Sequence, residues 1–135
     1  MVYYGCMTKQ EASSFWQASA REDLETAEGL FQIGKYAHSL FFCHLTTEKM
    51  LKAVYTKQHD DAPPVLHHLV KLWKTITVSS DGPATEEILN EMSTFNVEAR
   101  YDIFKQKLYK KATKEYTERF LTLTKEILSW LKTYL

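Results

Sequence analysis

The sequence predicts an all-α fold: an antiparallel, up-and-down helical bundle of four main helices plus a short helix. The 135 residues include only four glycines and three prolines, and almost no segment alternates apolar and polar residues as a strand would. Apolar residues recur instead at helical spacing along most of the chain. The segments between these periodic stretches are short, which favours antiparallel neighbours. We therefore expect a single helical domain over residues 1–135.

The first helix is expected to begin after Thr8 and to stop at Gly34. Thr8 and Glu11 have the spacing of a capping box, and glycine commonly ends a helix. Asp23 lies at the edge of the apolar stripe, which is unusual for an acid, and it is expected to pair with Arg100 or with a polar group of the second helix. The stripe consists of Trp16, Ala20, Leu24, Ala27 and Phe31.

The second helix should run from about Tyr36 to about Gln58, and it has two apolar faces. Such a helix is central in a bundle or lies at a subunit contact. Because one core cannot cover both faces, we expect this helix and parts of the last one to form a symmetric oligomer. One face carries Ala37, Phe41, His44, Glu48, Leu51 and Tyr55, and the other carries Cys43, Met50 and Val54.

Two prolines, Pro63 and Pro64, follow the second helix, and residues 67–73 predict a short third helix. A loop over residues 79–83 comes next, with Pro83 expected to open the fourth helix. The last helix follows a lysine-rich run. The stripe of the fourth helix is Ile88, Met92, Phe95, Ala99 and Ile103, and that of the last helix is Tyr109, Ala112, Tyr116, Phe120, Leu123, Ile127, Leu131 and Tyr134.

The charges balance overall but are unevenly distributed. Seventeen basic and seventeen acidic residues leave no net charge, which argues against a dedicated nucleic-acid coat protein. Two cysteines, Cys6 and Cys43, make no disulfide framework and indicate reduced thiols. The chain starts without the features of a signal peptide and lacks the roughly 18 consecutive apolar residues of a membrane helix. We expect a cytoplasmic protein that does not contact membranes.

The segment from Arg100 to Lys114 is the best candidate for binding. Arginine grips phosphate in a rigid fork, lysine adds point charge, and aromatic rings stack on bases. A structural salt bridge of the arginine and a solvated face of lysines are the alternatives. The candidates for nucleotide or phosphate binding are Arg100, Asn96, Lys107, Tyr109, Lys110 and Lys111.

His44 and Glu48 are four residues apart on one helical face, a spacing that can supply two metal ligands. A metal site needs three or four ligands, and the other histidines form no matching pair on another helix. The favoured interpretation is that these are core polar groups satisfied by neighbours. Asp23, His44 and Glu48 are thus supporting polar candidates, and neither a metal nor a cofactor is expected.

Taken together, several short segments resemble the HEPN domain family of small all-α proteins. The resemblance extends from about Phe15 to Leu135, and the order and spacing of the segments carry it. These segments are Ala20–Leu24 with Ala27, Glu48-Lys49 with Lys52 and Ala53, His68-Leu69, Ala99–Tyr101, and Tyr109–Thr113.

The resemblance implies a bundle that dimerises, with a functional arginine facing a cleft between protomers. Many members are ribonucleases in which Arg is followed, after four to six residues, by His and often by Tyr two positions later. Others pair with a minimal nucleotidyltransferase in toxin–antitoxin fashion, and in some of these the partner adenylylates the motif tyrosine. In this chain Lys107 stands where the histidine would be, and Tyr109 matches the tyrosine.

We therefore expect a HEPN-type domain that acts with a nucleotidyltransferase-like partner and contacts nucleotide or RNA through the basic Arg100–Lys114 region. It should form a homodimer or higher oligomer. One alternative is a HEPN ribonuclease with an altered motif, and another is a purely structural oligomerisation module. Because the motif histidine is missing, no catalytic residue is assigned.

Overall fold

The computed structural model of the protein describes residues 7–100 and 102–135, with side chains for residues 7–96 and 105–135. These residues form six helices and no strand, which confirms the all-α prediction. The helices are α1 (Lys9–Gln32), α2 (Tyr36–Gln58), α3 (Leu69–Trp73), α4 (Glu86–Arg100), α5 (Asp102–Lys111) and α6 (Lys114–Lys132).

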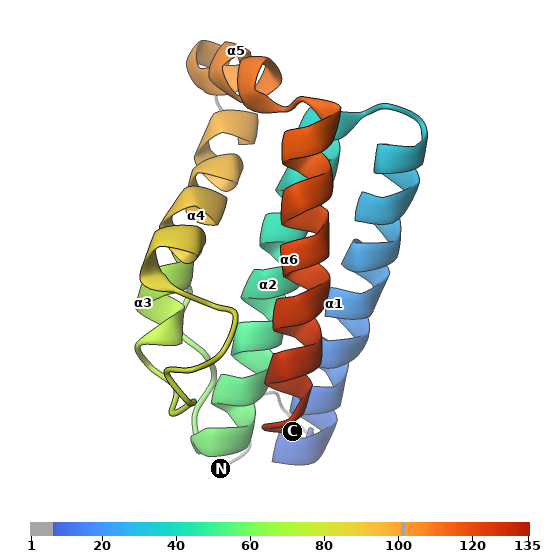
Figure 1. Cartoon of the computed structure of the whole chain (residues 1–135). Helices are drawn as coiled ribbons and strands as arrows, with labels where there is room; N and C mark the ends of the chain where they lie inside the picture. Colours follow the sequence, from blue (N-terminus) through green and yellow to red (C-terminus); the bar gives the residue numbers. More distant parts are fainter. Residues whose placement is uncertain (1–6, 101) are drawn as a thin grey trace.

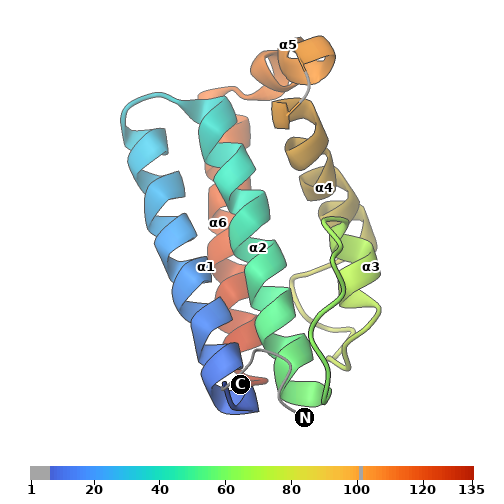
Figure 2. The ribbon, with the colours of Figure 1, turned by 180° about the vertical axis from the view of Figure 1, so that it is seen from behind.

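The long helices α1, α2, α4 and α6 run alternately up and down, as expected for an antiparallel bundle (Figure 1). The short helix α3 lies beside α4, and α5 lies across one end of the bundle. Viewed from behind, the first turns of α2 are at the same end as α5 (Figure 2). The α5 end is therefore where segments from the first and the last third of the chain meet.

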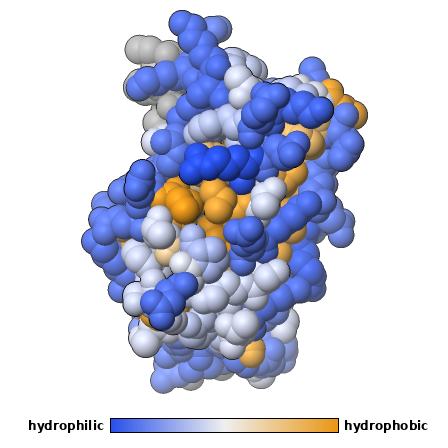
Figure 3. Space-filling model, viewed as in Figure 1, coloured by the Kyte–Doolittle hydropathy of each residue, from blue (hydrophilic) through white to orange (hydrophobic). Residues whose placement is uncertain are grey.

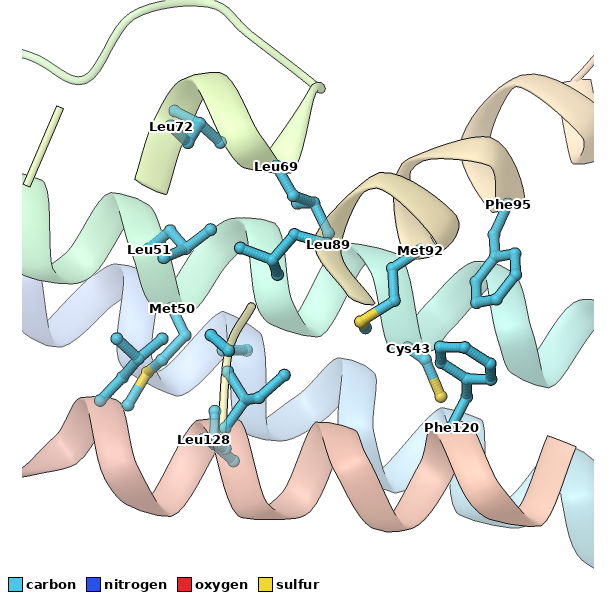
Figure 4. Close-up of a cluster of buried hydrophobic side chains, with 14 of the residues drawn as sticks. Cys43, Met50, Leu51, Leu69, Leu72, Leu89, Met92, Phe95, Phe120 and Leu128 are labelled. Atoms are coloured by element: carbon cyan, nitrogen blue, oxygen red, sulfur yellow. The ribbon is translucent and has the colours of Figure 1, made fainter. Parts of the chain in front are cut away.

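Helix α2 occupies the centre of the bundle and contacts every other described helix. On one side the buried Cys43 lies next to Phe120 of α6 (Figure 4). On another side Leu51 points toward Leu72 of α3 and Leu89 of α4. Most residues of both apolar faces are thus buried within one chain, which confirms the central position, whereas Phe41 is partly exposed. The expected oligomer through α2 and parts of the last helix stays a prediction.

The ends of α1 form as the sequence predicts. The Oγ1 atom of Thr8 accepts a hydrogen bond of 3.1 Å from the backbone N–H of Glu11. At the other end Gly34 has a φ of 78°, and the N–H of Lys35 donates to the carbonyl oxygen of Leu30 at 2.8 Å. This is the Schellman arrangement, in which glycine takes the left-handed conformation without a Cβ penalty. It sets the direction in which α2 begins.

The start of α4 differs from the expectation. Pro83 does not open the helix, which begins three residues later at Glu86. The Oγ1 atom of Thr85 accepts a hydrogen bond of 3.2 Å from the N–H of Ile88. The hydroxyl oxygen of threonine accepts a hydrogen bond from a backbone N–H of the first turn, and a proline side chain has no such acceptor. The threonine cap therefore decides where the helix starts.

The segment after Arg100 also differs, because α5 is a separate helix between α4 and α6. Thr113 starts α6, since its Oγ1 accepts a hydrogen bond of 3.1 Å from the N–H of Tyr116. Tyr109 therefore belongs to α5 and not to the stripe of the last helix, and it is 51% exposed. The other described stripe residues of α6 face the core.

Candidate functional site

A hollow in two parts lies where the start of α2 meets α5, and we call it the α2–α5 pocket. One part has a volume of about 300 Å³ and the other about 330 Å³. The first part is lined by Ala37, His38, Phe41, Phe42, Lys105, Leu108 and Tyr109. The second part is lined by Gly34, Lys35, Tyr36, Ala37, His38, Tyr109 and Ala112. Ala37, His38 and Tyr109 line both parts.

Leu108 fixes how α5 presents its side chains to this pocket. It is 2% exposed and belongs to the core cluster, so it anchors α5 against the bundle. Lys105 and Tyr109 are four residues apart, which places them on one side of α5. Both line the pocket, and the ring of Tyr109 lies 6.3 Å from the ring of His38 on α2. The burial of one leucine thus brings a lysine and a tyrosine to the start of α2.

The pocket combines aromatic rings with positive charge. Phe41 and Phe42 contact each other edge to face, at 5.6 Å between ring centroids. Lys35 and Lys105 supply the cations, and none of the described residues that line either part is acidic. Lys35 is also the N-cap residue of α2, and no side chain caps this end within the described residues. The first-turn N–H groups and the helix dipole add positive potential at this point.

The lysine run of residues 105–114 does not form one basic face. Lys105 lines the α2–α5 pocket, whereas Lys107 and Lys110 are exposed on other sides of α5. Lys111 is partly buried and points toward α4. Of the residues expected to bind nucleotide, the structure brings Tyr109 to the pocket, and it places Asn96 in α4 with 8% exposure.

Lys111 takes part in a polar network that joins α5 to α4 and α6. Its Nζ lies 3.1 Å from Oε1 of Glu91 and 3.1 Å from Oγ1 of Thr94. The hydroxyl of Tyr116 donates a hydrogen bond of 2.7 Å to the same oxygen of Glu91. This hydrogen bond, and then Lys111, hold the pKa of Glu91 below its ordinary value, against the effect of partial burial. In this structure Lys111 thus holds α5 in place.

Some expected site residues lie outside the described part of the chain. Arg100 is the last residue of α4, but its side chain is not among those described, and Tyr101 is not described at all. Cys6 also falls outside the described residues. The geometry between Arg100 and Tyr109 therefore stays a prediction.

His44 and Glu48 belong to a buried polar cluster. Nε2 of His44 donates a hydrogen bond of 2.8 Å to the carbonyl oxygen of His67, because a carbonyl can only accept. Glu48 accepts from Nδ1 of His67 at 3.0 Å and pairs with Nζ of Lys52 at 3.0 Å. Burial lowers the pKa of His44, which favours the neutral ring. Apart from the buried Nδ1 of His44, these polar groups have hydrogen-bond or ion-pair partners among their neighbours, which agrees with the interpretation favoured from the sequence.

Asp23 pairs with Lys49 of α2, at 2.6 Å between Oδ2 and Nζ. Both side chains are largely buried, with 14% and 23% exposure. This confirms the expected pairing with a polar group of the second helix. The pair links the edge of the α1 stripe to α2.

Of the described residues that line the pocket, Tyr109 is the one that was among the predicted site residues. The cations and rings that were missed include Lys35, His38, Phe41, Phe42 and Lys105. A local signal existed for two of them. Lys105 stands four residues before Tyr109, and Lys35 follows the glycine that ends α1. No spacing in the sequence, however, indicates that the start of α2 meets α5.

Other features of the described chain give weaker indications of function than the α2–α5 pocket does. Figure 3 shows that the α5 end of the viewed face is mainly hydrophilic, with an apolar patch in the middle of that face. Across the described residues, no three His, Cys, Asp or Glu side chains are arranged to hold a metal ion. No helix in this part combines the length and apolarity that a bilayer crossing requires. A further hollow on α6 mixes acids and bases, and it is lined by Lys114, Glu115, Glu118, Arg119, Thr122 and Leu123.

Comparison with known proteins supports the fold. The family model of the HEPN domain matches residues 13–134. The crystal structure of TT1696 from Thermus thermophilus is similar, with a TM-score of 0.74 and 21% sequence identity over 91% of this chain and 98% of that chain. No curated protein sequence matches the chain. At this level of identity, the likeness to the solved structure concerns the fold.

Proposed function

Because the chain belongs to the HEPN domain family, whose members often act on or with nucleic acids, we propose that it contacts nucleotide or nucleic acid at its α5 end. The half-exposed ring of Tyr109, at a pocket lined by Lys35 and Lys105, is the observation that carries this proposal. Cations attract phosphates, and an exposed aromatic ring can stack on a base. Arg100, Lys107 and Lys110 are the further phosphate contacts that we propose.

We further propose that the domain works with a nucleotidyltransferase-like protein in a toxin–antitoxin-like module, with Tyr109 as the acceptor. The phenolic oxygen of Tyr109 would attack the α-phosphorus of ATP, forming a phosphodiester bond. The bond from that phosphorus to the bridging oxygen would break, and pyrophosphate would leave. The phenolic proton would pass to a base of the partner enzyme or to water. The exposure of Tyr109 favours this role, since a tyrosine sealed in the core could not reach a second protein's site.

Intact-mass spectrometry tests this step directly. The protein is incubated with ATP and the proposed nucleotidyltransferase partner, and the added mass of one or more nucleotides is measured. We expect the addition on wild type and on Tyr134→Phe, because Tyr134 lies beyond the last residue of α6, at the end of the bundle opposite α5. Tyr109→Phe should show no addition. An unmodified wild type, or a modified Tyr109→Phe, would remove Tyr109 from the mechanism.

Efficient RNA cleavage by the purified domain is not expected. The place of the motif histidine is taken by Lys107, which is exposed on α5. The measurement is the cleavage rate of a mixed-sequence RNA by wild type and by Arg100→Ala. A robust rate that Arg100→Ala abolishes, with an unchanged circular dichroism spectrum, would favour the ribonuclease alternative.

HEPN domains often dimerise, and we propose a homodimer for this chain as well. Most of the apolar surface of α2 is buried within one chain, so we propose that exposed residues outside its buried faces contribute to the interface. Ile33, which is 69% exposed at the turn between α1 and α2, is the best apolar candidate at the α5 end. Light scattering at micromolar concentration should give about twice the mass of 15.8 kDa for wild type, and a lower mass for Ile33→Asp. A wild-type mass of one chain would exclude the homodimer.

A further inference from the structure

We propose that the α2–α5 pocket takes a single nucleotide unit in one orientation, with the base in the aromatic part and the phosphate at Lys35. This inference rests on the proposed function, since it specifies how the α5 end would hold its ligand. A free nucleotide and an unpaired nucleotide of an RNA strand share this chemistry. The pocket therefore selects a base with its phosphate.

The aromatic part fits a flat ring. Phe41, Phe42 and Tyr109 line it, together with the apolar side chains of Ala37 and Leu108. Its volume of about 300 Å³ is at the lower limit of small-molecule pockets, which span roughly 300–1,000 Å³. Such pockets are mostly apolar and carry a few polar groups that orient the ligand. A paired base inside a duplex could not enter a hollow of this size, so the base must be unstacked.

The second part fits an anion. Lys35 is exposed there and makes no ion pair within the described residues, in contrast to Lys111, whose charge is matched by Glu91. Among the described residues that line this part, none carries a carboxylate. The backbone N–H groups at the start of the 23-residue helix α2 add to the positive potential. An acidic group bound there would thus meet the exposed lysine, with no carboxylate of the described lining residues to compete.

The two parts are joined in a way that matches one nucleotide. They share Ala37, His38 and Tyr109 as lining residues, so the two parts are neighbours. The rings of Tyr109 and His38 lie 6.3 Å apart, and both residues line both parts. A base stacked on Tyr109 would place its phosphate toward the start of α2. Lys105 lines only the aromatic part, where it can contact the sugar or a second phosphate.

Titration calorimetry with AMP, adenosine and a short single-stranded RNA tests the inference on the full chain. We expect AMP to bind at least tenfold more tightly than adenosine, because adenosine lacks the phosphate. Tyr109→Ala and Lys35→Gln should each weaken AMP binding about tenfold, a loss within the range measured for base stacking and charged contacts. Tyr109→Phe should rescue the loss of Tyr109→Ala, since it keeps the ring. The control is Lys71→Gln, an exposed lysine on α3 that should bind as wild type does.

The outcomes separate this inference from the proposed function. If AMP does not bind but RNA does, and both pocket variants weaken RNA binding, the inference stands with the strand as the source of the nucleotide. If RNA binding depends on Lys107 and Lys110 and not on Tyr109 or Lys35, the pocket inference is overturned while the proposed function holds. Equal binding of adenosine and AMP, or no binding of either AMP or RNA, also overturns it. The mass measurement on Tyr109 is independent of these affinities.

Discussion

The buried charges of this protein are joined in clusters. Glu48 contacts Lys52 and His67, and Lys52 in turn lies 5.3 Å from the centre of the Trp16 ring. Burying a charge costs free energy unless partners surround it. Removing one member of a cluster therefore leaves the other charges buried without a compensating partner. Single substitutions in these contacts should therefore act on stability more strongly than the number of lost bonds suggests.

Asp23→Ala should lower the free energy of unfolding by roughly 1–3 kcal/mol, between the values for exposed and for fully buried ion pairs. The reason is that Lys49, 2.6 Å away and 23% exposed, would lose its partner. Urea denaturation measures the change. The control is Glu28→Ala, which removes a pair with Lys125 whose side chains are 43% and 48% exposed. Equal effects of the two substitutions would mean that the burial of Asp23 is energetically unimportant.

His44 should make the protein less stable at mildly acidic pH. Burial lowers its pKa in the folded state below the ordinary value of 6.5. Well above pH 6.5 the ring is neutral in both states, and as the pH falls through 6.5 the unfolded chain takes up a proton first. Stability should therefore decrease from pH 7.5 to pH 5.5, and this slope should be smaller in His44→Gln. Thermal melts across this range test it, with the exposed His68→Gln as a control that keeps the wild-type slope.

At the scale of helices and loops, local chemistry sets most of the boundaries. Thr8, Thr85 and Thr113 each cap a helix start with a side-chain oxygen, and Gly34 ends α1. The sequence predicted the cap at Thr8 and the helix end at Gly34, because a capping box and a glycine are local signals. It did not predict the break at Thr113, since apolar residues at helical spacing continue across it. This continuous apolar spacing predicted one helix where the structure has two.

The loop before α4 is held against the end of α6 by a close contact. A Cβ at Gly82 would lie 2.2 Å from ring carbons of Trp130, so Gly82→Ala should destabilise the fold by about 1–3 kcal/mol through overpacking. Gly29→Ala is the matched control with the opposite sign. Nothing lies within 4 Å of its added Cβ, and alanine in a helix should stabilise by about 0.5–1 kcal/mol. Denaturant midpoints of both variants measure the difference in stability. If Gly82→Ala is as stable as wild type, the close contact with Trp130 is contradicted.

At the scale of the whole molecule, periodicity predicted the helical bundle but not how its helices share one core. The stripes of α1 and α6 identified buried faces directly. The two faces of α2 were also visible, yet their partners come from α1, α3, α4 and α6, which no local pattern reveals. The same limit applies to the candidate site. Tyr109 was predicted from its spacing, whereas Lys35 and His38 join it through the tertiary meeting of α2 and α5.

Since α2 contacts all the other described helices, the bundle should unfold as one unit. Leu51→Ala removes a 1% exposed side chain from the centre and should cost about 2–5 kcal/mol. Circular dichroism and tryptophan fluorescence should report the same midpoint in wild type and in the variant, because Trp16, Trp73 and Trp130 lie on three different helices. Two separate midpoints would show that part of the bundle folds independently of α2.

The position of Cys43 gives the protein a built-in chemical reporter. Its thiol is fully buried, and burial raises its pKa to about 12. Alkylating reagents attack the thiolate, so this sulfur is shielded both by the side chains around it and by its own protonation. In a Cys6→Ser background, the rate of labelling would measure how often the centre of the molecule opens, without any added probe. The same thiol is a poor choice for attaching a dye, since a labelled core could not close.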